Sequence, residues 1–137
     1  MAQEPGFQIR PLERRLSGGR PLYWTSCVGS CDRAKRPLAC RIFPLTPYVI
    51  HKGIIITEID PRAKPVCPLA EEHNLLEPDF RRRVGKVCRQ LGREPEIREF
   101  LEILTREIDE YRRLAEMFVR SSPRCKARIL KEKRLPD

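Results

Sequence analysis

The stretch YVIHKGIIITEI, residues 48 to 59, contains two runs rich in β-branched residues on either side of Lys52-Gly53. β-branched residues favour strands, and a glycine in the short break supplies the backbone freedom that a tight turn needs. The stretch therefore predicts a β-hairpin. Asp60-Pro61 follows directly and is expected to end the second strand.

Two helices are predicted on the C-terminal side of this hairpin. The first begins at Glu77-Pro78-Asp79 and ends at Gly92, and its apolar residues recur on one helical face: Phe80, Val84, Val87, Cys88 and Leu91. The second begins near Glu94-Pro95-Glu96 and ends before Pro123, with a longer apolar stripe: Ile97, Phe100, Leu101, Leu104, Ile108, Tyr111, Leu114, Ala115 and Phe118. We expect both faces to pack into the core, and a dimerisation seam is the alternative for the second.

The segment on the N-terminal side of the hairpin is predicted to be irregular. Three prolines interrupt residues 27–47, where we expect a loop region with one helical turn that begins at Pro37. Residues 1–20 are expected to form an extended arm or a single strand, residues 21–122 one domain, and residues 123–137 a basic, flexible tail. The predicted fold class is α+β, with a small irregular Cys-rich region and a β-hairpin followed by two helices.

The composition limits the compartment and the kinds of partner. The chain has 137 residues, enough for a single domain, and no apolar run reaches the roughly 20 residues that a membrane span requires. The N-terminal residues lack the pattern of a secretory signal, so we expect a cytoplasmic protein in which thiols stay reduced. The formal net charge of +9 favours a polyanionic partner, but the cations are scattered along the sequence. A solvated basic surface is the first expectation, and nucleic-acid binding is the alternative.

Six cysteines are the main chemical feature of the chain. Four of them, with the spacing Cys-x3-Cys-x8-Cys-x26-Cys, lie in segments predicted to be irregular: Cys27, Cys31, Cys40 and Cys67. Four thiolates are a ligand set that suits zinc or an iron–sulfur cluster. Because turns with Gly and Pro allow side chains from separate segments to converge, we expect these cysteines to hold one metal centre.

The other ligand candidates have competing structural roles. Cys88 lies on the apolar face of a predicted helix, where cysteine usually acts as a small core hydrophobe, so a fifth ligand at this position is the alternative. Cys125 lies in the basic tail, and His51 lies at the predicted hairpin tip, where solvent exposure is expected. His73 follows Cys67 closely enough in sequence to reach the same site. Disulfide bonds and inert thiols are the alternatives to metal binding.

The segment RPLACRIFPL, residues 36–45, resembles the RP-x-x-CR-x-FP signature of the YkgJ-like cysteine cluster family. With the cysteines on either side of it, the resemblance covers residues 23–69. It implies a small cytoplasmic protein that chelates zinc or an iron–sulfur cluster and has no established reaction. The family's metal-binding cysteines map most directly onto Cys31, Cys40 and Cys67, and then onto Cys27. Members usually carry an earlier cluster ending in a Cys-Cys pair, whereas this chain has no cysteine before Cys27.

Three functional hypotheses follow. The first is a metal-binding protein, with zinc preferred because a tetrahedral zinc site needs only four ligands. The second is a basic adaptor that binds nucleic acid and uses the metal only to fold. The third is a redox or electron-transfer protein in which a cysteine outside the metal set reacts. A protein partner is compatible with all three, and neither a substrate nor an oligomeric state follows from the sequence.

Overall fold

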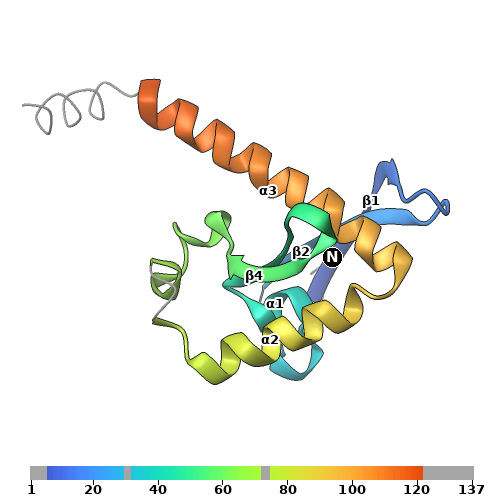
Figure 1. The fold of residues 1–137 in the computed structure, drawn as a ribbon, viewed down its shortest axis with the longest axis horizontal. Helices are drawn as coiled ribbons and strands as arrows, with labels where there is room; N and C mark the ends of the chain where they lie inside the picture. The colour runs from blue at the N-terminus through green and yellow to red at the C-terminus, as the bar shows by residue number, and fades with distance from the viewer. Residues whose placement is uncertain (1–5, 30–31, 72–74, 122–137) are drawn as a thin grey trace, which may run out of the picture.

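The computed structural model describes residues 6–29, 32–71 and 75–121. Two antiparallel strand pairs and three α-helices make up this part of the chain, with the long helix α3 at its C-terminal end (Figure 1). The predicted α+β class is confirmed. The expected tail at 123–137 lies outside the described residues.

The central hairpin is present and is longer than predicted. Strand β3 spans Leu45–Val49 and strand β4 spans Ile55–Ile59, and they pair antiparallel from Leu45 opposite Ile59 to Val49 opposite Ile55. The turn uses positive φ angles at Lys52 (62°) and Gly53 (72°), so the glycine stands where left-handed backbone is required.

Pro47 lies inside β3, where the sequence predicted an irregular segment. The strand tolerates it because Ile50 N bonds Ile54 O and Asp60 N bonds Pro44 O, at 2.9 Å each. Hydrogen-bonded pairs alternate along an antiparallel ladder, and these two bonds place residues 44, 46, 48 and 50 at the hydrogen-bonded pairs. Pro47 therefore lies at a non-hydrogen-bonded pair, where the missing N–H costs the ladder no bond. At the equivalent position Val49, the outward N–H donates instead to Thr105 Oγ1 of α3 at 2.9 Å.

The two predicted helices are confirmed with nearly the expected ends. Helix α2 spans Pro78–Leu91, is preceded by Glu77 and ends at Gly92. Helix α3 spans Pro95–Ser121. Proline at the first helical position begins both helices, since its missing N–H would have had no helical partner there.

The core lies between the β3–β4 hairpin, α2 and the first half of α3. Its buried cluster comprises Ile42, Leu45, Ile55, Leu76, Val84, Cys88 and Leu101. Gly92 is required for this packing, because a Cβ atom at that position would lie 1.9 Å from Ile55 Cδ1. The α2–α3 junction and the hairpin turn are joined by Arg98, which donates to Gly92 O at 3.0 Å and to Gly53 O at 2.8 Å.

The apolar stripe of α3 was predicted to pack along its whole length, and the structure confirms only its first half. Leu101 and Ile108 are buried, whereas Leu114 is 40% exposed and Phe118 is 74% exposed. In Figure 1 the C-terminal end of α3 extends away from the rest of the described structure. The core therefore ends about midway along the helix.

Residues 1–20 do not form a separate arm in their described part. Strand β1, Gly6–Arg15, pairs antiparallel with β2, Pro21–Val28, so the boundary expected at residue 20 falls inside a hairpin. Polar contacts with glutamates of α3 join this hairpin to that helix, and Leu16, between the two strands, is buried. A strand, which was the alternative for residues 1–20, is present there as β1.

Candidate metal centre

The signature segment folds into a one-turn helix held by an arginine clamp. Helix α1, Leu38–Ile42, is preceded by Pro37, whose carbonyl accepts hydrogen bonds from Cys40 N at 3.0 Å and Arg41 N at 3.2 Å. The Arg41 side chain folds back onto the preceding loop, with Nε donating to Arg36 O and Nη2 to Ala34 O, both at 2.8 Å. The helical turn predicted at Pro37 is confirmed.

This clamp gives Cys40 a fixed outward position. Ile42 is buried in the core and anchors one side of α1, while Cys40 is exposed on the surface. Because the Arg41 side chain bonds the carbonyls of Arg36 and Ala34 and so holds the preceding loop against α1, the Cys40 side chain is presented on a braced turn. The RP-x-x-CR portion of the signature thus has a local structural explanation that does not depend on metal.

Cys67 is held on a second braced segment, after strand β4. Asp60 starts the turn Pro61–Ala63 by accepting from Arg62 N at 2.9 Å, and Cys67 N then donates to Ala63 O at 2.9 Å. Cys67 O accepts from Ala70 N at 3.0 Å at the turn Pro68–Ala70. Ala63 and Ala70 are both buried, which fixes the backbone around the partly exposed Cys67.

Cys27 lies in strand β2, opposite Phe7, rather than in a loop as the sequence predicted. Its side chain is exposed, and Gly29 follows with a positive φ of 69°, which turns the chain as the strand ends. Cys31, the fourth predicted ligand, lies outside the described residues, as do His73 and Cys125.

Within residues 6–29, 32–71 and 75–121, no group of three or more His, Cys, Asp or Glu side chains is arranged to hold a metal ion. Cys27 and Cys40 are exposed and Cys67 is partly exposed, and these three do not form such a group with one another. Accessible thiols are chemically suited to zinc or to an iron–sulfur cluster, both of which bind thiolates.

Cys88 differs from the other described cysteines. It is 3% exposed and packs in the core on the inner face of α2. Desolvation by burial raises the pKa of its thiol, which disfavours the thiolate that a metal or an electrophile would need. This environment agrees with the core role expected from the helical spacing, and we do not include Cys88 in the proposed ligand set. His51 is exposed at the hairpin turn, as predicted.

An apolar pocket of about 300 Å³ lies beside α1, between that helix, β3, α2 and α3. Its walls include Leu38 and Phe43 near α1, Cys88 of α2, and Phe100 of α3. The charged residues at the pocket, Asp60 and Arg62, bond to each other at 2.6 and 2.8 Å. No sequence motif predicted this pocket, because it forms where the apolar faces of four elements meet incompletely.

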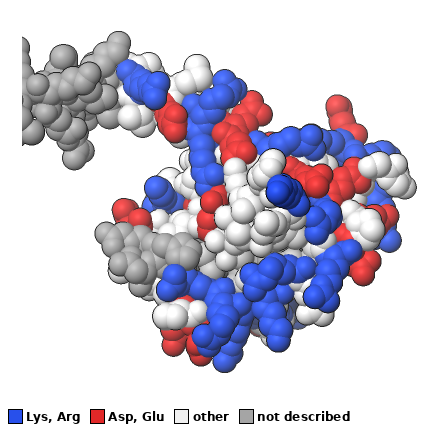
Figure 2. All heavy atoms as spheres, viewed as in Figure 1, with Lys and Arg blue, Asp and Glu red and all other residues white. Residues whose placement is uncertain are grey.

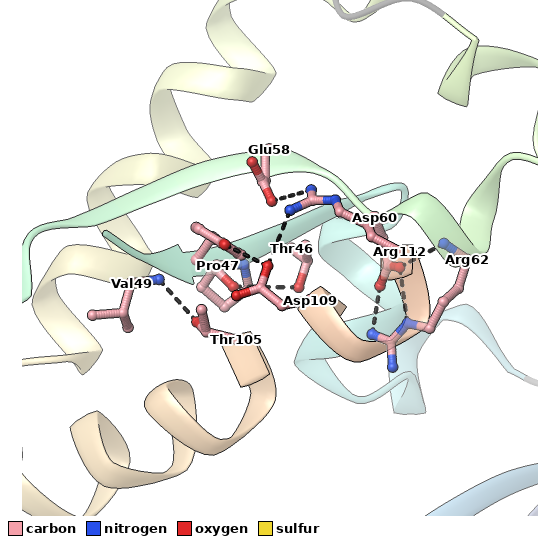
Figure 3. Close-up of polar contacts among 10 residues, drawn as sticks. Thr46, Pro47, Val49, Glu58, Asp60, Arg62, Thr105, Asp109 and Arg112 are labelled. Atoms are coloured by element: carbon pink, nitrogen blue, oxygen red, sulfur yellow. Dashed lines mark hydrogen bonds and ion pairs between the residues drawn. The ribbon is translucent and has the colours of Figure 1, made fainter. Parts of the chain in front are cut away.

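A polar cluster joins α3 to the outer part of the β3–β4 hairpin (Figure 3). Tyr48 donates to Asp109 Oδ1 at 2.5 Å, and Arg112 lies over the Tyr48 ring with its Cζ 5.2 Å from the ring centroid. Arg112 also pairs with Glu58 of β4 and, at 3.5 Å, with Asp109. The hydrogen bond to Asp109 is the main cause that raises the pKa of Tyr48. Since each carboxylate already has a cationic partner, the cluster fastens α3 to the sheet and resembles no acid–base pair.

No family model matches the chain, and neither the curated proteins nor the solved structures include a match to it. No helix in the described part of the chain has the length and apolar character needed to cross a membrane.

Proposed function

We propose that the protein binds a metal centre through Cys27, Cys31, Cys40 and Cys67, with zinc as the first candidate and an iron–sulfur cluster as the alternative. The observation that carries the proposal is the presentation of Cys40 on an exposed, clamped turn. Cys27 and Cys67 support it, because each is accessible on the surface and each ends or follows a strand.

The arrangement of these cysteines favours binding that is coupled to ordering. Cys27, Cys40 and Cys67 do not together form a metal-binding group among the described residues, so metal binding would bring the strand end at Cys27 and the turns at Cys40 and Cys67 to one centre. Metal sites in small proteins commonly assemble in this way, so that the free energy of metal binding contributes to folding. The bound metal would then stabilise the cysteine-bearing segments rather than catalyse a reaction.

Several cations lie near Cys40 in sequence and would offset the negative charge of four thiolates. Arg33, Lys35, Arg36 and Arg41 all belong to the segment that the α1 clamp holds. Nearby positive charge favours the anionic form of a ligand. At Cys88, by contrast, desolvation by burial raises the pKa of the thiol, and the positive charge of Arg89 is the smaller, opposing cause.

Metal analysis of the purified full-length chain tests the proposal. We expect one zinc per chain, or iron and sulfide with near-visible absorption after purification without oxygen. Cys40→Ser should lose most of the metal, because a four-ligand site that loses one thiolate binds far more weakly. Removal of the metal with a chelator should lower the melting temperature of the wild-type chain but leave that of Cys40→Ser nearly unchanged.

Cys125→Ser is the matched control, because it makes the same chemical change at a cysteine outside the proposed set. It should retain the wild-type metal content. Equal metal content in Cys40→Ser and the wild type, or a wild-type chain that takes up neither zinc nor iron on reconstitution, would contradict the proposed site.

A further inference from the structure

The solvent face of α2 carries a row of cations. Five positively charged residues on or just after this helix are exposed: Arg82, Arg83, Lys86, Arg89 and Arg93. Positions 82, 86, 89 and 93 are separated by four, three and four residues, which places them along one side of the helix. Figure 2 shows Lys and Arg side chains gathered along the part of the surface that α2 occupies.

Ion pairing is sparse along this row. Elsewhere in the molecule some arginines are paired, as Arg14, Arg20 and Arg112 each are with a glutamate. On α2, Arg82 pairs with Asp79. Among the residues that the structure describes, Arg83, Lys86, Arg89 and Arg93 have no acidic partner within ion-pair distance.

Such a row is unfavourable for the isolated molecule. Like charges three and four residues apart on a helix repel each other, so Lys86 and Arg89, which form no ion pair with another described residue, weaken α2. The opposite face of α2 already supplies the packing, through the buried Val84 and Cys88. The cations therefore add nothing to the core and are available to an anionic partner.

We propose that the exposed face of α2 binds the phosphate backbone of a nucleic acid. The helical part of the row, from Arg82 to Arg89, spans seven residue steps, about 10 Å at 1.5 Å per residue, and Arg93 extends the row just beyond the helix, so that it can run beside several phosphates. Contacts of this kind are electrostatic and carry little sequence information. This site is distinct from the cysteine set and does not depend on the metal.

The same face is poorly suited to two other anionic partners. A helix that lies on a membrane surface needs an exposed apolar face beside its cations, whereas the apolar face of α2 is buried in the core. A stable interface with an acidic protein needs a buried apolar centre. The large apolar residue exposed on α2 is Val87, at 39%. A polyanion with regularly spaced charges therefore fits the row better than a membrane surface or an acidic protein does.

The test measures binding of fluorescein-labelled oligonucleotides of about 20 residues, single-stranded and duplex, by anisotropy between about 50 and 200 mM salt. With four or five phosphate contacts, the logarithm of the affinity should fall with the logarithm of the salt concentration with a slope of about −4. Poly-glutamate and vesicles containing anionic lipid are titrated in parallel, and tight binding to either one without oligonucleotide binding overturns the proposal.

A triple variant and a matched control separate α2 from the net charge of the molecule. In Arg83→Gln/Lys86→Gln/Arg89→Gln, the slope should weaken by about 2.7 and the affinity at low salt should fall roughly tenfold or more. The control, Arg106→Gln/Arg113→Gln/Arg120→Gln, removes the same charge from exposed positions of α3 and should bind like the wild type. Equal losses in the two variants would refute a site on α2.

The single variant Lys86→Gln provides a second test if the triple variant does not fold. It should weaken the slope by about 0.9, and an unchanged slope would contradict the proposal.

Discussion

Cys27 and Cys88 are the same residue type in opposite environments. Cys27 is exposed on β2, whereas Cys88 is 3% exposed inside the core, where desolvation raises the pKa of its thiol. Thiolate is the reactive form of cysteine. Burial in the core therefore lowers the reactivity of Cys88 in two ways, since it excludes reagents from the sulfur and favours the protonated thiol. These surroundings oppose the redox hypothesis as far as it relies on Cys88.

A thiol-reactivity assay on the metal-free chain tests this contrast. We expect Cys88→Ala to leave the number of rapidly reacting thiols unchanged under native conditions and to lower by one the number that react in denaturant. Cys27→Ser, the matched exposed position, should lower the rapid count by one. Rapid loss of one native thiol in Cys88→Ala would show that the core opens at this site.

At the scale of elements, α3 is one helix with two environments. Its first half closes the core, with Leu101 5% exposed, and its second half exposes Leu114 to 40% and Phe118 to 74%. Periodicity alone cannot distinguish the two halves, because the apolar spacing continues to Phe118. The difference arises because the β3–β4 hairpin is only five residues long on each side and covers only part of a 27-residue helix.

Leucine-to-alanine substitutions in the two halves should have different costs. Leu101→Ala should lower the free energy of unfolding by about 2–5 kcal/mol, because it leaves a cavity in a packed core. Leu114→Ala should change it by only about 0.5 kcal/mol, as is usual for surface positions. Urea unfolding at several protein concentrations measures both. A large, concentration-dependent effect at Leu114 would show instead that the outer half of α3 packs against a second copy.

At the scale of the whole molecule, the N-terminal hairpin is attached to α3 mainly by carboxylates. Glu107 pairs with Arg14 at 2.9 Å, Glu96 with Arg20 at 3.0 Å, and Glu99 Oε1 accepts from Ser17 N at 2.8 Å. The β3–β4 hairpin, by contrast, contributes Leu45 and Ile55 to the apolar core. The two hairpins should therefore respond differently to acid.

Hydrogen bonding by Ser17 lowers the pKa of Glu99, with the side-chain bond as the larger cause and the backbone N–H as the smaller one. Because the pKa of Glu99 is lower in the folded state, its ionised carboxylate stabilises the attachment at pH values above the unfolded-state pKa of about 4.3. This stabilisation is lost as the pH falls through the lower, folded-state pKa. In hydrogen exchange corrected for intrinsic rates, β1–β2 should lose protection in acid before β3–β4 does. Glu99→Gln should reduce the pH dependence of β1–β2 protection. Simultaneous loss of protection in both hairpins would contradict a separate, acid-sensitive attachment.

Much of the secondary structure was predictable because its signals are local. Pro78 and Gly92 mark the ends of α2 through missing or permissive backbone groups, and the turn at Gly53 follows from its conformational freedom. The β1–β2 hairpin was not predicted, because residues 1–20 were expected to form an extended arm or a single strand. In the structure the two strands pair with a register shift between Pro11 and Arg15 and are joined by a turn in which Gly19 N bonds Leu16 O.

The sequence by itself determined the fold class, the ends of both helices, the central hairpin and the six cysteines. Tertiary structure decided which of those residues face water. It buried Cys88, set Cys40 outward on a turn held by Arg41 and ended the core midway along α3. It also left Arg83, Lys86 and Arg89 of α2 without an ion pair to another described residue, whereas Arg82 pairs with Asp79. The physical reason is that capping and turn preferences act over a few residues, whereas burial and charge pairing depend on which distant segments come to lie against each face.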